Sequence, residues 1–221
     1  MMKCAAIIPA AGIGTRFGGS MPKQFSEYES IPILIHTLKL FERIPEVNSV
    51  IVAITPSWEE YTNEMIVVHG LNKVKKIVAG GKERQDSVSN ALNTLLPNEY
   101  DVILIHDAVR PFVSPELVRK IIRIADETGA VIPALKPKET IKQIDEKGMV
   151  IKTLDRTILC AVQTPQGFKA DIILSSYKKA MKNNFYATDD AALVEYSGFP
   201  VQVIDGEETN IKITTQFDIH F

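Results

Sequence analysis

Glycines and two cations gather in one loop near the start of the chain, directly after the apolar run 5–8. The glycines and cations of this loop are Gly12, Gly14, Gly18, Gly19, Arg16 and Lys23. Glycine lets backbone N–H groups crowd around an anion, because no Cβ blocks the approach. Arg16 and Lys23 add full charges to these dipoles. We therefore expect a polyphosphate cradle after a first strand, since an ordinary glycine-rich turn has no use for two embedded cations.

Two familiar phosphate-binding motifs do not match this loop. A Walker loop requires Gly-Lys-Ser/Thr, but Pro22 precedes Lys23 and Gln24 follows it. A dinucleotide fingerprint requires a third glycine where Phe17 stands. The loop therefore predicts phosphate binding through backbone N–H groups and cations, as in those motifs, but with a different spacing of its glycines and lysine.

A carboxylate and two further cations are candidates for the same chemistry. Asp107 follows the apolar run 101–105, and Mg²⁺ takes one or two carboxylates and completes its shell with water and phosphates. The alternative is that Asp107 only caps a loop. Arg110 can grip a second phosphate bidentately or pair with Asp107. Lys212 lies within a predicted apolar strand and needs an anionic partner, for which a substrate phosphate is one candidate.

A second glycine turn precedes a predicted helix. Gly80-Gly81 and Ser87 offer N–H groups and a hydroxyl that can read a nucleobase edge, although strand–glycine–helix turns are common. Thr164 and Thr188 are weaker candidates. Thr188, with the two aspartates after it, first suggests the N-cap of a helix.

The candidate residues are mostly cations plus one carboxylate. We recognise no Ser-His-Asp constellation, reactive cysteine context or paired-histidine metal site in the sequence. Such a set suits a reaction in which positioning and charge neutralisation provide most of the catalysis. Phosphoryl and nucleotidyl transfer fit that description.

The composition excludes several other classes. The 221 residues are 45% hydrophobic and 24% charged with a net charge of −2, which indicates one domain over 1–221 and no basic field for nucleic acid. No apolar run approaches the roughly 18 residues of a membrane span. Cys4 and Cys160 lack metal-like spacing, so we expect reduced, buried thiols in a cytoplasmic protein without membrane contact.

Short apolar runs alternate with helical patterns along most of the chain. The predicted strands are 5–8, 49–54, 74–78, 101–105, 130–135, 201–204 and 210–214. The predicted helices are 32–43, one after a capping-box pattern at 57–60, one from about 85, one from 115 to Gly129 with Ser114 as its N-cap, 170–182 and 188–198. This alternation predicts a doubly wound α/β fold, with a mostly parallel sheet covered on both faces. Ligands bind beyond the carboxyl ends of such strands, where the glycine loop, Gly80-Gly81 and Asp107 all fall.

Residues 136–158 break this rhythm. Two alternating runs, 140–144 and 149–154, flank a turn at 145–148 and predict a protruding β-hairpin arm. An isolated hairpin is marginal in water, so the arm needs something to pack on. We expect a partner subunit, and hence a homodimer through the arm. Packing on the chain's own domain is the alternative.

Ordered motifs over nearly the whole chain resemble the 2-C-methyl-D-erythritol 4-phosphate cytidylyltransferases of the non-mevalonate isoprenoid pathway. The matching segments are 10–18, 22–25, Gly80-Gly81 with Arg84 and Ser87-Val88, 106–112, 140–142, Arg156 with 163–166, 188–191 and 210–214. The resemblance implies a Rossmann-like nucleotidyltransferase that uses Mg²⁺. Its reaction transfers the cytidylyl group of CTP to 2-C-methyl-D-erythritol 4-phosphate, giving 4-diphosphocytidyl-2-C-methyl-D-erythritol and pyrophosphate.

The resemblance also implies roles for individual residues. Those implied in catalysis are Arg16, Lys23, Lys212 and Asp107, with Asp107 also at the metal. Those implied in the nucleotide pocket are Ala10, Ala11, Gly12, Gly14, Gly80, Gly81, Arg84, Ser87 and Ala108. Those implied in the acceptor pocket are Arg110, Thr140, Arg156, Thr164 and Thr188. Thr140 and Arg156 would reach the partner subunit's site across a homodimer.

Three alternatives remain open. A ribitol 5-phosphate cytidylyltransferase looks similar through the loop and 106–108, so the acceptor pocket must decide. Phe17, at the position of the third glycine, disfavours an NAD-dependent dehydrogenase. Asp107, together with Lys23 and Lys212, disfavours a non-catalytic nucleotide-binding regulator. The sequence departs from the family at Glu139, where aspartate is usual, and at Cys160, where tryptophan is frequent.

Overall fold

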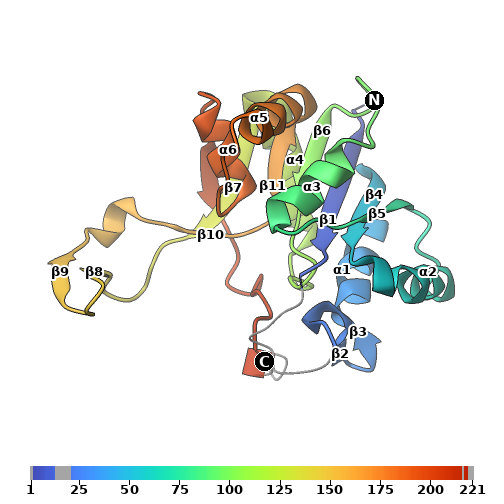
Figure 1. Ribbon diagram of the computed structural model, residues 1–221, viewed down its shortest axis with the longest axis horizontal. Helices are drawn as coiled ribbons and strands as arrows, with labels where there is room; N and C mark the ends of the chain where they lie inside the picture. Colours follow the sequence, from blue (N-terminus) through green and yellow to red (C-terminus); the bar gives the residue numbers. More distant parts are fainter. Residues whose placement is uncertain (1, 13–20, 216, 219–221) are drawn as a thin grey trace.

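The computed structural model describes residues 2–12, 21–215, 217 and 218. In this part of the chain, eight strands form one sheet in the order β10-β7-β11-β6-β1-β4-β5, with β12 beside β7 (Figure 1). The strands are β1 (Cys4–Ala10), β4 (Val47–Ile54), β5 (Val74–Ala79), β6 (Val102–Ile105), β7 (Ala130–Leu135), β10 (Ala161–Val162), β11 (Gln166–Lys169) and β12 (Gln202–Asp205). Two small strands, β2 (Glu27–Tyr28) and β3 (Ile31–Pro32), pair with each other after the short helical turn η2 (Lys23–Phe25).

The sheet is mostly parallel, as predicted. β1 pairs in parallel with β4 and β6, β4 with β5, and β7 with β12. β11 runs antiparallel to both β6 and β7, and β10 runs antiparallel to β7. The sequence did not predict these two strands, because β11 contains a glycine and no β-branched residue, and β10 has only two residues.

Helices cover both faces of the sheet. They are α1 (Ile33–Glu42), α2 (Glu59–Val68), α3 (Arg84–Leu92), α4 (Pro115–Thr128), α5 (Ala170–Lys182) and α6 (Asp190–Tyr196). Alternate residues of β1 face opposite ways, as the pleat requires. Ala6 and Ile8 pack into a core with α1 and α4, whereas Ala5 and Ile7 pack into a core with α3, α5 and α6. The doubly wound α/β fold is confirmed.

Helix starts were predicted with mixed success. α4 begins as expected, because the Ser114 hydroxyl accepts from the Leu117 N–H at 3.0 Å and Pro115 is the first helical residue. The capping box at 57–60 is wrong: the helical turn η3 (Pro56–Trp58) leads into α2, and no side chain caps that helix. A capping box forms instead at α3, between Glu83 and Asp86.

Three further expectations need correction. Pro32 is the N-cap of α1 rather than its first helical residue. Asp189, not Thr188, caps α6, because its carboxylate accepts from the Ala192 N–H at 3.1 Å. Segment 210–214 forms no strand, although the Ile213 N–H donates to the Val109 carbonyl at 2.9 Å and the Ile213 side chain is buried. The alternating apolar pattern of this segment therefore reflects an irregular segment that buries Ile213, and not a strand.

Residues 136–158 leave the body of the molecule (Figure 1). Within them, β8 (Lys142–Ile144) pairs antiparallel with β9 (Val150–Thr153), and the helical turn η4 (Arg156–Ile158) follows. Apolar side chains of this segment are more than half exposed: Ile144, Met149, Val150, Ile151 and Ile158. A two-stranded hairpin with exposed apolar side chains is marginal alone, so its packing against a partner subunit stays a prediction.

Both cysteines are free thiols, as expected. Cys4 is buried, and burial raises the pKa of its thiol, which keeps it protonated. Cys160 is exposed, so the expectation that it would be buried is wrong. Among the helices of residues 2–12, 21–215, 217 and 218, none has both the length and the apolar character that crossing a membrane requires.

Candidate active site

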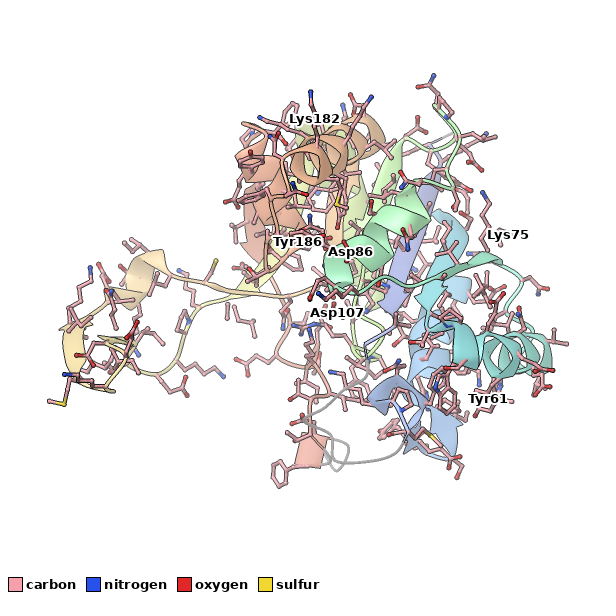
Figure 2. The ribbon with its side chains drawn as sticks, viewed as in Figure 1. Tyr61, Lys75, Asp86, Asp107, Lys182 and Tyr186 are labelled. Atoms are coloured by element: carbon pink, nitrogen blue, oxygen red, sulfur yellow. The ribbon has the colours of Figure 1, made fainter. Side chains whose placement is uncertain are left out.

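The side chain of Asp107 lies where the chain leaves β6, near the middle of the molecule (Figure 2). Its carboxylate oxygens lie 2.8 Å from Lys212 Nζ, 3.2 Å from Arg84 Nε and 3.6 Å from Arg110 Nε. Asp107 is only 7% exposed, and burial alone would raise the pKa of its carboxyl. The three cations outweigh burial and lower this pKa, so Asp107 stays ionised.

A buried hydrogen-bond chain fixes the backbone of Asp107. The Thr164 hydroxyl accepts from the Asp107 N–H at 3.1 Å and lies 3.1 Å from His106 Nδ1. His106 Nε2 lies 2.9 Å from the Arg110 carbonyl oxygen, which can only accept, so the ring proton is on Nε2 and Nδ1 accepts from Thr164. Burial lowers the pKa of His106 to about 4, which keeps the ring neutral. The interpretation of His106 as a structural hydrogen-bonding residue agrees with this geometry.

One cleft holds most of the residues implied in nucleotide binding. Its lining includes Ala10, Ala11, Gly12, Lys23, Gly81, Arg84, Ser87, Asp107, Ala108 and Lys212. Two side chains hydrogen-bond to carbonyl groups at the start of the loop and hold it in place. Gln24 Nε2 donates to the Ala10 carbonyl at 2.5 Å, and the Thr55 hydroxyl donates to the Ala11 carbonyl at 3.1 Å. Gly14 and Arg16 lie outside the described residues.

The turn at Gly80-Gly81 is built for close packing. A Cβ on Gly80 would lie 2.1 Å from the Ala11 Cβ, so only glycine fits between the two loops of the cleft. The Gly81 N–H donates to the Ser87 hydroxyl at 3.0 Å, and that hydroxyl lies 3.2 Å from the Glu83 carbonyl. Ser87 therefore holds the turn in shape, a structural role that its sequence position did not indicate.

A second cleft holds three residues implied in acceptor binding. Arg110, Thr164 and Thr188 line it, together with Arg84, Asp107 and Lys212. The last three residues also line the first cleft, so the two clefts meet at Asp107. Thr140 and Arg156 lie instead in segment 136–158 of the same chain, where the Arg156 guanidinium donates to the Lys138 carbonyl. They line neither cleft.

The structure corrects the interpretation of Lys212. Its side chain is 40% exposed and belongs to no strand, so it is not the buried strand lysine that the pattern suggested. Its anionic partner here is Asp107. The alternative for Arg110, an ion pair with Asp107, is present in the structure, and Arg110 Nη1 also donates to the Asn210 carbonyl at 2.7 Å. Burial lowers the pKa of Arg110 from its ordinary value, although Asp107 opposes that effect.

One charged partner at this site was not predicted from the sequence. Arg84 Nη2 lies 2.8 Å from Asp190 Oδ2, and Asp190 is 1% exposed. The pattern at 188–190 suggested only a capped helix, and Asp190 lies 106 positions from Arg84. A buried acid with no local partner in the sequence is the only signal that would have indicated a distant cation.

The geometry sets limits on a metal site. Among the residues that the structure describes, no three His, Cys, Asp or Glu side chains are placed to hold a metal ion together. Asp107 offers one carboxylate between the two clefts, beside Lys212. Since Mg²⁺ bound to a triphosphate needs only one or two protein carboxylates, the site fits a metal ion that arrives with a nucleotide. It does not fit a metal held by the protein alone.

Comparisons with known proteins point the same way as this geometry. The sequence model of the 2-C-methyl-D-erythritol 4-phosphate cytidylyltransferases (IspD) matches residues 4–221. The chain belongs to this family. A relative of that name from Alkaliphilus metalliredigens is 45% identical over 218 residues, which cover 98% of this chain and 90% of the relative. One from Bacillus cereus is 41% identical over 213 residues, covering 96% and 93%.

Solved structures agree with the family assignment. The 4-diphosphocytidyl-2C-methyl-D-erythritol synthase from Anaerococcus prevotii is similar with a TM-score of 0.86 and 33% identity, covering 100% of this chain and 94% of that protein. The 2-C-methyl-D-erythritol 4-phosphate cytidylyltransferase from Thermus thermophilus is similar with a TM-score of 0.80 and 30% identity, covering 99% and 96%. The Rossmann-like nucleotidyltransferase fold of the family is therefore that of this chain.

Proposed function

We propose that this protein transfers the cytidylyl group of CTP to 2-C-methyl-D-erythritol 4-phosphate, giving 4-diphosphocytidyl-2-C-methyl-D-erythritol and pyrophosphate. The observation that carries the proposal is the meeting of two clefts at Asp107 and Lys212 in a chain of this family. A transfer between two phosphorylated substrates needs two such sites with cations where they join. The curated relatives carry the methylerythritol name, which disfavours ribitol 5-phosphate as the acceptor.

The reaction is a displacement at the α-phosphorus of CTP. A bond forms between an oxygen of the acceptor phosphate and the α-phosphorus, and the bond from that phosphorus to the bridging oxygen breaks. Pyrophosphate leaves with the electron pair. A phosphate is already deprotonated near neutral pH, so no general base is required. Asp107 is suited to placing the cations rather than accepting a proton, because its lowered pKa makes it a weak base.

Neutralisation of negative charge provides most of the catalysis in this proposal. Lys23 and Arg16 hold the triphosphate and the charge that develops on the leaving pyrophosphate. Lys212, at the junction of the clefts, contacts the attacking phosphate and the α-phosphate. Asp107 places Lys212 and would hold Mg²⁺ brought in with CTP. Bound in this way, Mg²⁺ would neutralise phosphate charge.

Recognition of the two substrates is divided between the clefts. Ala10, Ala11 and Gly12, with the turn at Gly80-Gly81, bind the nucleotide. The N–H groups and carbonyls of that turn read the base, with Arg84 and Ser87 supporting its shape, and Ala108 contacts the ribose. Arg110, Thr164 and Thr188 bind the acceptor. Thr188 is exposed and Thr164 is buried in the lining of this second cleft, which supports the proposal.

The protein acts as a homodimer in this proposal. The exposed apolar side chains of the hairpin and the separation of Thr140 and Arg156 from both clefts support it. Each arm would then bring Thr140 and Arg156 to the acceptor cleft of the partner subunit. The free, exposed thiol of Cys160 supports a reducing, cytoplasmic environment.

Pyrophosphate release tests the proposed reaction. With CTP, Mg²⁺ and a panel of polyol phosphates, we expect fast release with 2-C-methyl-D-erythritol 4-phosphate and little with ribitol 5-phosphate. The reverse preference would move the protein to the ribitol class. Release with neither acceptor would contradict the enzyme assignment and favour a nucleotide-binding protein.

Three alanine variants test the charges at the junction. Lys23→Ala, Asp107→Ala and Lys212→Ala should each lower turnover by roughly 100-fold or more, the scale of losing one charge-stabilising group. Lys75→Ala is the matched control, because Lys75 lies on β5 far from Asp107 and its side chain is exposed (Figure 2). Near-normal turnover in any of the three variants would remove that residue from its proposed role.

Mixed dimers test whether the arm acts across subunits. Inactive Lys23→Ala subunits mixed with inactive Arg156→Ala subunits should regain activity, because one site of each mixed dimer then has both side chains. Mixing Lys23→Ala with Asp107→Ala should restore nothing, since both residues act in their own subunit. The absence of rescue in dimers verified as mixed by mass spectrometry would show that Arg156 acts within its own chain or not at all.

A further inference from the structure

Asp190 has a buried carboxylate that its helix does not need. Asp189 already caps α6, and Asp190 follows as the first helical residue. The partners of Asp190 come from elsewhere: the Tyr177 hydroxyl donates to Oδ1 at 2.5 Å, and Arg84 Nη2 lies 2.8 Å from Oδ2. Removing a carboxylate from water carries a large desolvation cost, which only well-placed partners offset. The position of Asp190 is therefore explained by Arg84 and Tyr177 rather than by helix capping.

Arg84 joins this carboxylate to the catalytic one. Its Nη2 faces Asp190 and its Nε faces Asp107 at 3.2 Å. Burial opposes the charge of the guanidinium, but Asp190 and Asp107 outweigh it and raise the pKa of Arg84. Arg84 also lines both clefts. Its position at their junction is thus set by two carboxylates, one of which lines neither cleft.

Asp190 is itself held from two sides. Gln166 on β11 donates to Asp189 Oδ2 at 2.8 Å and accepts from the Ala191 N–H at 3.0 Å, so both neighbours of Asp190 are tied to the sheet. Tyr177 is buried in the core formed with α5. Burial and Asp190 raise the pKa of Tyr177, which keeps its hydroxyl protonated as a donor. The carboxylate has little freedom to follow Arg84 if Arg84 moves.

The first residues of α3 make further contacts with the segment that precedes Asp190. Gln85 Nε2 donates to the Phe185 carbonyl at 2.9 Å, and Gln85 Oε1 accepts from the Ala187 N–H at 3.0 Å. The Tyr186 hydroxyl donates to Asp86 at 3.0 Å (Figure 2). Three consecutive residues, 84–86, therefore bind the segment 185–190, which carries Thr188 of the acceptor cleft. The nucleotide turn and the acceptor loop are joined as one unit.

We propose that Asp190, supported by Tyr177, is a positioning residue that holds the guanidinium of Arg84 at the junction of the two clefts. Its contribution to the reaction passes through Arg84 alone. The inference rests on the proposed function, because Arg84 is placed between a nucleotide and an acceptor. It adds to that function a residue outside both clefts on which the geometry of the junction depends.

A double-mutant cycle tests this directly. The single variants Asp190→Asn and Arg84→Ala and the double variant are compared by kcat and by KM for each substrate. Contacting residues couple strongly, so Asp190→Asn should lower kcat/KM on the order of 10-fold in the wild-type background and cause no further loss beside Arg84→Ala. If Asp190→Asn lowers kcat/KM by the same factor with and without Arg84, the proposal is overturned. A general structural role of Asp190 would lower kcat/KM in both backgrounds.

Two variants that each remove one hydroxyl from α5 separate an effect on the reaction from an effect on folding. Tyr177→Phe removes one hydroxyl from Asp190, and Ser176→Ala removes the neighbouring buried hydroxyl, which has no hydrogen-bond partner among the described residues. With an unchanged Tm in both variants, only Tyr177→Phe should lower kcat/KM, by about threefold or more. Equal kinetic constants in the two variants would overturn the role of Tyr177.

The proposed function and the positioning role fail in different ways. A wild-type protein that releases no pyrophosphate contradicts the proposed function. In that case the dissociation constant of Mg²⁺-CTP is measured by calorimetry for the wild type, the two single variants and the double variant. Coupling between Asp190→Asn and Arg84→Ala in those constants supports the positioning role. Additive losses in binding free energy contradict it. An active wild-type protein with additive variants contradicts the positioning role alone.

Discussion

The buried carboxylate of Asp107 and the three cations around it are the constraint on which the site depends. Lys212 and Arg110 lie beside Oδ2 of Asp107, and Arg84 lies beside Oδ1. A carboxylate this buried is stable as an ion only because those cations offset its desolvation. Removing it would leave three cations facing one another where the two clefts meet.

The surroundings of Asp107 are held by further buried hydrogen bonds and an ion pair. The Asp107 N–H, the Thr164 hydroxyl and the neutral His106 ring form a chain of buried hydrogen bonds, and Asp190 holds Arg84 from the other side. Three cations face two buried carboxylates, which leaves one positive charge for an incoming phosphate. Charge held in place before the substrate binds needs no reorganisation during the reaction. This is the physical reason why a family with little covalent chemistry can accelerate nucleotidyl transfer.

Local patterns predicted the parts of the fold that local physics determines. The apolar strands 49–54 and 130–135 and the helix start at Ser114 were predicted well, because apolar runs, proline and a capping hydroxyl act over a few residues. β11 was missed, because its four residues are stabilised by pairing on both edges rather than by their own propensity. Segment 210–214 was misassigned because one buried isoleucine anchors an irregular chain that merely alternates.

In the candidate site too, residues with informative sequence neighbours were predicted, whereas contacts between distant segments were not. Asp107 and Lys23 were recognisable because their sequence neighbours, a strand end and a glycine loop, already indicate phosphate chemistry. The anionic partner of Lys212 was expected, with a substrate phosphate as one candidate, but Asp107 was not identified in that role, and Asp190 was assigned only to a helix start. Those contacts join residues about 100 positions apart and appear only once the sheet has formed.

A crystal structure with Mg²⁺, a CTP analogue whose α–β bridge resists cleavage, and 2-C-methyl-D-erythritol 4-phosphate tests the central claim most directly. We expect the triphosphate beside Lys23 and the acceptor phosphate beside Arg110. We also expect Lys212 released from Asp107 toward the α-phosphate, while Arg84 stays between Asp107 and Asp190. Two substrates bound with their reacting phosphates away from the junction of the clefts would contradict the proposed mechanism.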